Sequence, residues 1–332
     1  MTADSPQVAP PVPTSATEIT VVVPFMNARH YLIRTIPALW SAASEAGCSI
    51  ILVDNGSTDG SAEWLRANSP MVPVILEGKG LTIGGLRNLG ARAAGGRYLS
   101  FLDADCLIEP SYFTRAVSVL ATAQAAATGC EYDLPEAAHW IERTHHAMHF
   151  VGRAREVVYI NSGNFFVERS AFERVGGFDS TLLTGEDADI GHRLVRAGFR
   201  IYESPDVRAF HLGNAKTLRQ HYRRTLWHGL GMLSTLSTLR VDRPTCMLLA
   251  HLTLTLTSVV GVLQSRGSLA GRLLAVVFAQ LAVPVVTVVF RWFQTRRRFN
   301  AAAGVVLYWL YYWARAHALL LVMIGRGAHI RR

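Results

Sequence analysis

The chain of 332 residues contains only four cysteines, and no two of them stand in a C-x-x-C pair. We therefore expect neither a disulfide framework nor a structural zinc site, and a reducing compartment fits this cysteine usage. Residues 1–17 have no basic start and no apolar core, so we expect a disordered tail rather than a secretory signal. The sequence also lacks an internal repeat, a zinc-finger pattern and a basic-zipper pattern.

Charged residues become sparse after Pro244, although the formal net charge of the chain is +9. A membrane helix needs roughly 20 apolar residues. Three apolar segments come close to that length, namely 245–263, 273–290 and 301–324. We therefore expect, after the tail, a soluble domain, a basic juxtamembrane linker and a membrane region, at 18–215, 216–244 and 245–325.

The distribution of arginines between the loops that join the apolar segments predicts the orientation in the membrane. The loop 291–298 holds four of them, against two in the loop before it. This bias predicts that the loop and the N-terminal domain face the cytoplasm, at an inner or plasma membrane. Arg315 and His317 interrupt the third segment, so it either crosses the bilayer or lies along its surface. A soluble helical domain with a buried hairpin is the alternative.

Short apolar runs alternate with helical patterns before the membrane region. The expected strands are Glu18–Pro24, Ser49–Val53, Val74–Leu76 and Arg97–Leu102. The expected helices are Tyr31–Ala46, Ser61–Ala67, Gly84–Ala94, Pro110–Thr128 and Glu186–Gly198, with a strand and a short helix inside Tyr159–Phe178. The stretch 139–155 has no clear pattern. This alternation predicts an α/β fold with a mainly parallel sheet, whose ligands bind at the carboxyl ends of the strands.

Two aspartates directly follow the fourth expected strand, in the sequence Asp103-Ala104-Asp105. Carboxylates at this spacing can converge on one hard cation, Mg²⁺ or Mn²⁺, which takes further ligands from substrate phosphates. The pattern therefore predicts a metal site and a diphosphate-bearing substrate. A helix cap or a solvated acidic turn is the alternative.

The turn Asp54–Gly60 follows the second expected strand and is rich in Asp, Asn, Gly and Ser. We expect it to present Asp54 and Ser57 to a ribose or a base. The alternative is an ordinary helix N-cap made by Ser57 or Asp59.

Arg87 and Asn88 stand early in the helix after Gly84-Gly85. The planar fork of an arginine can pair with a phosphate, so both residues are candidates for phosphate or base contacts. A surface arginine is the alternative.

Three carboxylates begin the helix expected at 186–198, those of Glu186, Asp187 and Asp189. A carboxylate here can take the proton from an attacking hydroxyl, and like charges at this spacing raise one pKa. Capping of the helix by the same acids is the alternative.

Taken in order, these features resemble family 2 of the inverting glycosyltransferases, which have the GT-A fold. The resemblance covers Ile19–His211 and rests on Pro24, Val53–Gly60, Arg87-Asn88, Asp103–Asp105, Gly176–Asp179 and Glu186-Asp187. It implies nucleotide contacts by Asp54 and the turn Pro24–Asn27, metal and diphosphate binding by Asp103 and Asp105, and Asp187 as the base. Glu186 is also expected to bind the substrate. His211 matches a histidine that approaches the metal in many relatives.

The expected reaction is metal-dependent, inverting transfer of a sugar from a nucleotide-sugar to a hydroxyl acceptor. The acceptor is expected to be lipid-linked or part of an envelope or extracellular polysaccharide, and no nucleic-acid partner is expected. Processive relatives carry Gln-x-x-Arg-Trp, whereas Arg224 follows Gln220–Arg223 here, which argues against processive synthesis.

Two other functions compete with this prediction. A nucleotidyltransferase would need a glycine-rich, basic phosphate loop after the first strand, where this chain has Pro24–Asn27. A non-catalytic membrane scaffold would not need Asp54, Asp103, Asp105 and Asp187 together.

Overall fold

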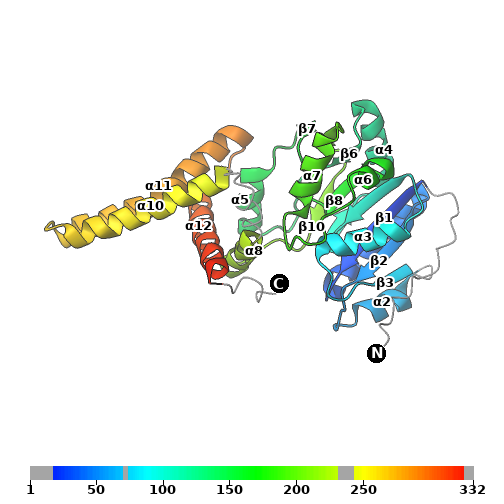
Figure 1. Ribbon diagram of the computed structural model, residues 1–332, viewed down its shortest axis with the longest axis horizontal. Coiled ribbons are helices and arrows are strands. Elements are labelled where there is room, and N and C mark those ends of the chain that lie inside the picture. The colour runs from blue at the N-terminus through cyan, green and yellow to red at the C-terminus, as the bar shows by residue number, and fades with distance from the viewer. Residues whose placement is uncertain (1–17, 70–73, 231–242, 325–332) are drawn as a thin grey trace. The chain divides into compact units, whose positions relative to one another are not determined.

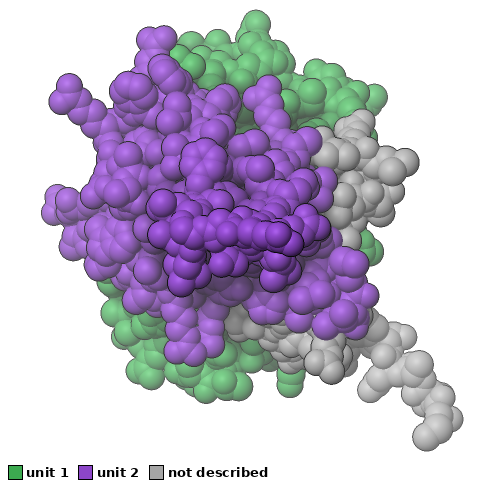
Figure 2. All heavy atoms as spheres, turned by 90° about the vertical axis from the view of Figure 1, so that its left-hand side faces the viewer, with its two compact units in different colours: residues 1–131, 153–181, 186–210 green, residues 132–152, 182–185, 211–332 purple. Residues whose placement is uncertain are grey.

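The computed structural model describes residues 18–69, 74–230 and 243–324. The tail expected at 1–17 lies outside the described residues. The chain divides into two compact units, which Figure 2 shows in different colours. Unit 1 comprises 1–131, 153–181 and 186–210, and unit 2 comprises 132–152, 182–185 and 211–332.

Unit 1 is built on an eight-stranded sheet with the order β3-β2-β1-β4-β8-β6-β9-β7 (Figure 1). Its strands are β1 Ile19–Phe25, β2 Ser49–Asp54, β3 Val74–Glu77, β4 Tyr98–Leu102, β6 Ala127–Gly129, β7 Arg155–Val157, β8 Asn164–Glu168 and β9 Ile201–Glu203. Strands β3, β2, β1 and β4 are parallel, whereas β8 runs antiparallel to β4 and β6, and β7 antiparallel to β9. The expected α/β fold is confirmed, with a sheet that is mixed beyond β4.

The helices of unit 1 are α1 Arg29–Ala46, α2 Ser61–Asn68, α3 Ile83–Ala93, α4 Tyr112–Ala123, α6 Arg169–Arg174 and α7 Glu186–Arg196. Helix α1 illustrates how the apolar spacing in the sequence predicts a helix. Leu32, Ile36 and Leu39 recur at helical spacing and are all buried. Gly47, with φ 63°, ends the helix in the left-handed conformation that glycine adopts without a steric penalty.

Two of the differences from the predicted element boundaries have a clear structural cause. Strand β1 continues through Pro24 to Phe25, because β4 pairs with β1 only as far as Val22. The missing N–H of Pro24 therefore leaves no gap in the pairing with β4. The helix expected to reach Thr128 ends at Ala123, and β6 follows, because Ala126 donates its N–H to the Arg200 carbonyl and the strand pairs with β8 and β9.

Four phenylalanines form a contacting group within the core of unit 1. Phe101 lies in contact with Phe172 and Phe178, at ring-centroid distances of 5.2 and 5.1 Å. Phe165 lies 6.4 Å from Phe178. Such tilted and edge-on pairs are favourable beyond the area that they bury. They fix the backbone just before Asp103 and just before Asp179.

A separate two-stranded sheet pairs β5, Cys106–Ile108, with β10, Ala209–His211. Strand β5 begins directly after Asp105, and β10 ends at His211. The pairing of these two strands is a long-range link that no local pattern in the sequence indicates.

The described part of unit 2 contains the helices α5 Trp140–His149, α8 Leu218–Leu230, α10 Arg243–Gln264, α11 Leu269–Thr295 and α12 Ala301–Met323. The last three are long and apolar enough to cross a membrane, and many of their apolar side chains are exposed, such as Phe278 at 76% and Leu263 at 79%. These helices indicate membrane association and match the three apolar segments of the sequence. The unassigned stretch 139–155 holds α5, and the segment 216–244 holds α8 within its described part.

Candidate active site

The loops after β1 and β2 are tied together by Asn27. The backbone N–H of Asn27 donates to Ser57 Oγ at 3.0 Å, and its side-chain Oδ1 accepts from the Thr58 N–H at 2.8 Å. Asn27 adopts a positive φ of 50°, a conformation that asparagine tolerates better than most residues. The two candidate nucleotide-binding loops are therefore held side by side at the carboxyl edge of the sheet.

Asp54 closes the second of these loops. Its Oδ1 accepts from both the N–H and the Oγ–H of Ser57, at 2.9 and 2.7 Å, and the residue is 9% exposed. Helix α2 begins only at Ser61, with Gly60 at its N-cap and no side-chain cap at that residue. Ser57 therefore shapes the turn around Asp54 and does not cap the helix.

The Asp103-Ala104-Asp105 segment forms a tight turn between β4 and β5. The Cys106 N–H donates to the Asp103 carbonyl at 3.0 Å, and Ala104 between the acids is buried. Carboxylate oxygens of Asp103 and Asp105 lie within 4.8 Å of one another. Both side chains are half-buried. Two hard oxygen donors at this separation suit a divalent cation such as Mg²⁺ or Mn²⁺.

Arg87 joins this turn to the start of α7. Its Nη2 lies 2.6 Å from Asp103 Oδ1 and its Nη1 lies 2.8 Å from Glu186 Oε1. The side chain is 2% exposed, and its guanidinium lies 5.6 Å from the centre of the Phe178 ring. Arg87 is therefore not a surface arginine, which was the alternative that the sequence left open. One buried cation holds two acidic segments that are 83 positions apart, Asp103 and Glu186.

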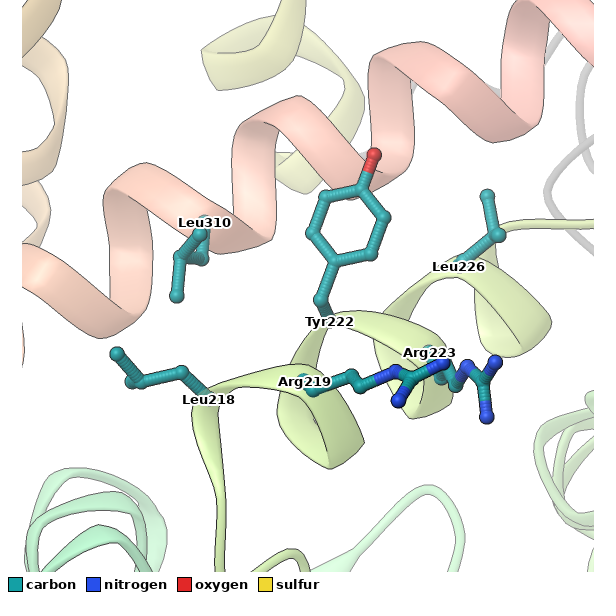
Figure 3. Close-up of a pocket in the computed structure, with 6 residues that line it drawn as sticks. All are labelled: Leu218, Arg219, Tyr222, Arg223, Leu226 and Leu310. Carbon is teal, nitrogen blue, oxygen red and sulfur yellow. The ribbon is translucent and has the colours of Figure 1, made fainter.

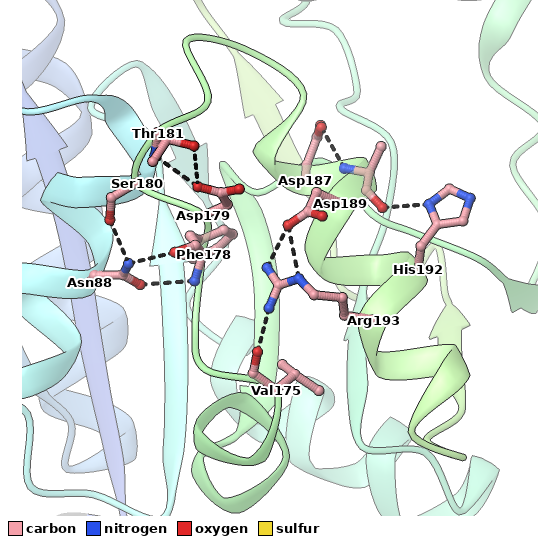
Figure 4. Close-up of polar contacts among 11 residues, drawn as sticks. Asn88, Val175, Phe178, Asp179, Ser180, Thr181, Asp187, Asp189, His192 and Arg193 are labelled. Carbon is pink, nitrogen blue, oxygen red and sulfur yellow. Dashed lines mark hydrogen bonds and ion pairs between the residues drawn. The ribbon is translucent and has the colours of Figure 1, made fainter. Parts of the chain in front are cut away.

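The three carboxylates at the start of α7 have different surroundings, and Figure 4 shows those of Asp187 and Asp189. Asp189 is paired with Arg193 at 2.6 Å, and Glu186 accepts from Ser162 Oγ at 2.9 Å as well as from Arg87. Asp187 Oδ1 accepts from the Ala188 N–H at 2.7 Å. Burial, together with the negative charge of the neighbouring Glu186, raises the pKa of Asp187 to about 6. Asp187 is therefore the carboxylate of this helix best suited to accept a proton near neutral pH.

Asn88 has a role that the sequence did not indicate. Its amide donates to the Phe178 carbonyl at 2.7 Å and to Ser180 Oγ at 3.1 Å, and its Oδ1 accepts from the Phe178 N–H at 2.9 Å (Figure 4). Asn88 thus fixes the loop that leads toward α7. Ser162, the partner of Glu186, stands in no motif, so nothing in the sequence pointed to it.

His211 belongs to unit 2 and is 4% exposed. Its N–H donates to the Asp133 carbonyl at 3.2 Å, and its ring lies 4.6 Å from that of Tyr132.

The candidate site residues of unit 1 fall into two groups at the same sheet edge. Asn27, Asp54 and Ser57 form one group, and the other holds Arg87, Asp103, Asp105, Glu186 and Asp187.

The family model described as "Glycosyl transferase family 2" matches residues 20–177. The chain carries a family 2 glycosyltransferase domain. The matched range contains the loops of Asp54 and Asp103 as well as Arg87, and α7 follows shortly after its end.

Two curated relatives match the chain at low sequence identity. The succinoglycan biosynthesis protein ExoA of Rhizobium meliloti is 24% identical over 61% of this chain and 65% of the relative. The pre-mycofactocin glycosyltransferase of Mycobacterium tuberculosis is 26% identical over 82% of this chain and 58% of the relative. The chain thus spans about three-fifths of the length of these relatives.

Among solved structures, the mannosyltransferase PcManGT of Pyrobaculum calidifontis, in complex with GDP-Man and Mn²⁺, is similar in fold. The TM-score is 0.60 at 16% identity, over 97% of this chain and 91% of that one. The similarity supports the GT-A architecture of the family 2 domain together with its C-terminal helices.

Replacing Arg87 with methionine is expected to destabilise unit 1 strongly. The change leaves Asp103 and Glu186, which are 30% and 11% exposed, without their cation. Breaking a buried ion pair in this way costs about 3–5 kcal/mol. The effect is measured as a shift of the thermal unfolding midpoint of the full chain in detergent.

The matched control is Arg97→Met. Arg97 is 63% exposed and lies 3.4 Å from Glu168, so its loss should cost at most about 1 kcal/mol. Equal shifts for the two variants would show that Arg87 does not hold the site together.

Proposed function

We propose that the chain is a membrane-associated glycosyltransferase that moves a sugar from a nucleotide-sugar donor to a hydroxyl acceptor, with inversion at the anomeric carbon. The observation that supports this proposal best is the Arg87 bridge. It joins Asp103, a candidate metal ligand, to Glu186, the neighbour of the candidate base Asp187. Two patterns far apart in the sequence therefore belong to one site.

The donor nucleotide is expected to occupy the loops after β1 and β2. Pro24 lies near the end of β1 and Asn27 lies in the loop after it, whereas Asp54 ends β2 and Ser57 lies in the loop that follows. The bonds that shape the second loop use Oδ1 of Asp54, so we propose that Oδ2 accepts from a hydroxyl or amide group of the nucleotide. Binding in these loops places the diphosphate toward the neighbouring β4.

Asp103 and Asp105 are proposed to hold the divalent metal, with His211 as a third ligand at the end of β10, the strand that pairs with β5. The fit rests on two half-buried carboxylates with oxygens within 4.8 Å. A bound Mg²⁺ or Mn²⁺ would neutralise charge on the departing diphosphate. The Arg87 guanidinium contacts Oδ1 of Asp103, and a charge-assisted contact of this kind orients the carboxylate.

Asp187 is proposed to accept the proton of the acceptor hydroxyl. Its raised pKa of about 6 leaves it mostly ionised at pH 7 and still basic enough to take a proton during attack. Attack by an activated hydroxyl in one displacement inverts the anomeric configuration.

The acceptor is proposed to be lipid-linked or to belong to a cell-envelope or extracellular polysaccharide. Three helices long and apolar enough to cross a membrane support this, as does the relative that is named for succinoglycan biosynthesis. The arginines of 291–298 favour a catalytic domain that faces the cytoplasm, at an inner or plasma membrane.

The test is nucleoside diphosphate release from a panel of nucleotide-sugars, with Mg²⁺ or Mn²⁺ and a lipid extract of the source membrane as acceptor. Purified full-length protein in detergent should turn over one donor. The anomeric configuration of the product, read by NMR, should be opposite to that of the donor. Release that is absent with every donor, together with no metal-dependent nucleotide binding, would favour a non-catalytic scaffold.

A further inference from the structure

A groove on unit 2 runs between α8 and α12 (Figure 3). It encloses about 430 Å³, within the range of roughly 300–1,000 Å³ that is usual for small-molecule sites. Its lining residues are Leu218, Arg219, Tyr222, Arg223, Leu226 and Leu310. None of them belongs to the active site described above.

The surface of the groove is almost wholly apolar, and two arginines of α8 stand beside it. Leu218, Leu226 and Leu310 form the floor, and Tyr222 extends from α8 toward α12 (Figure 3). Arg219 and Arg223 are exposed and stand four positions apart on α8. Like charges at this spacing repel one another on a helix. An anion placed beside both arginines relieves that repulsion.

The two arginines have no counter-charge in the described part of the chain. Neither Arg219 nor Arg223 makes an ion pair or a side-chain hydrogen bond there, and α8 contains no acidic residue. Arg224, the next residue, instead donates to the Gly213 carbonyl and to Asn214 Oδ1. The guanidinium groups of Arg219 and Arg223 are thus available to a ligand.

The position of the groove indicates what kind of anion reaches it. Leu310 belongs to α12, a helix long and apolar enough to cross a membrane. Helix α8 packs along α12, with Tyr222 Oη 3.1 Å from His317 Nδ1 and Arg315 Nη1 donating to the His228 carbonyl at 3.2 Å. One wall of the groove therefore belongs to a helix long and apolar enough to cross a membrane, and from such a position a lipid can enter the groove from the bilayer.

We propose that this groove binds the phosphate group of an anionic membrane lipid, which lies between Arg219 and Arg223, with the lipid chain along Leu218, Leu226 and Leu310. Arginine forks match the geometry of phosphate oxygens. A free phosphate ion would gain nothing from three leucines, whereas a lipid chain buries apolar surface on them. The proposal concerns binding, so it stands or falls independently of sugar transfer.

The test uses full-length protein in phosphatidylcholine nanodiscs that contain a small fraction of photoactivatable, diazirine-labelled phosphatidic acid. After illumination, labelled peptides are identified by mass spectrometry, with labelling of α10 as the internal reference. We expect labelling of α8 and of the peptide around Leu310 in the wild type. Arg219→Gln/Arg223→Gln should reduce it about tenfold, since each interfacial arginine attracts anionic lipid.

The matched control is Arg266→Gln/Arg298→Gln, which removes the same charge from exposed arginines outside the groove and should leave the labelling unchanged. A second variant, Leu218→Ser, keeps both arginines and should also weaken labelling. Unlabelled phosphatidic acid should compete, whereas inorganic phosphate and phosphatidylcholine should not. Equal labelling of the wild type and the Arg219→Gln/Arg223→Gln variant, or equal competition by inorganic phosphate, would overturn the proposal.

Discussion

Asp187→Asn is expected to lower the rate of sugar transfer by about 10²–10⁴-fold, the usual contribution of a general base. The amide has almost the same shape, and it can still accept from the Ala188 N–H through its oxygen. The amide oxygen is, however, too weakly basic to take the hydroxyl proton. The measurement is nucleoside diphosphate release under saturating donor, so the loss should appear in kcat.

The loss should not come from unfolding. Folding raises the pKa of Asp187 to about 6, so the folded state binds its proton more tightly than the unfolded state, and ionisation at pH 7 opposes folding. A neutral amide removes that opposition. We therefore expect the thermal midpoint of Asp187→Asn at pH 7 to equal or exceed that of the wild type, a typical exchange of stability for activity at a functional site.

The pH dependence of kcat/KM gives a second readout of the same residue. With a pKa of about 6, the base is mostly ionised at pH 7, and activity should fall about tenfold at pH 5. Glu186→Gln removes the negative charge that helps to raise this pKa. The acid limb of that variant should move to lower pH, whatever its plateau activity.

Asp189→Asn is the matched control in the same turn of α7. Asp189 is held by Arg193 four residues on, a type of pair worth about 0.3–0.5 kcal/mol. Its removal should leave kcat and the acid limb nearly unchanged. A loss as large as that of Asp187→Asn would mean that the start of α7 needs its total charge rather than one base.

The sequence predicted the parallel half of the sheet well, because its signals are local. β-Branched runs, helical spacing and Gly47 each act within a few residues, and the structure places β1, α1 and β2 within two residues of the expected bounds. Strand β6 was mistaken for helix. Its residues are alanine, threonine and glycine, and only pairing with β8 and β9, more than 30 positions away, makes them a strand.

In the candidate site, too, features that depend on local sequence were predicted and long-range contacts were not. Asp103 and Asp105 are one residue apart, so their convergence follows from the turn alone. The Arg87–Glu186 contact joins residues 99 positions apart, and no spacing in one sequence reveals it. Arg87 was predicted to contact substrate phosphate. The structure adds that it contacts two carboxylates, so its contribution to substrate binding stays a prediction.

Asp105→Ala is expected to weaken Mn²⁺ binding and to lower kcat/KM by about 10²–10³-fold. A divalent metal contributes several kcal/mol of charge stabilisation, and 1.36 kcal/mol corresponds to a tenfold rate. Asp105 is the better residue of the pair to substitute. Asp103 also contacts Arg87, so the loss of Asp103 would disturb the fold as well as metal binding. Calorimetric titration of Mn²⁺ into the full-length protein, with nucleoside diphosphate present, measures binding without relying on turnover.

The control is Glu109→Ala, which removes a nearby carboxylate that is already paired with Arg115 at 2.8 Å. It should bind Mn²⁺ like the wild type. If Asp105→Ala kept wild-type Mn²⁺ affinity while losing activity, Asp105 would act on the donor directly and the metal would be held elsewhere. If it kept both, the Asp103–Asp105 turn would be structural, and the proposed metal dependence would be wrong.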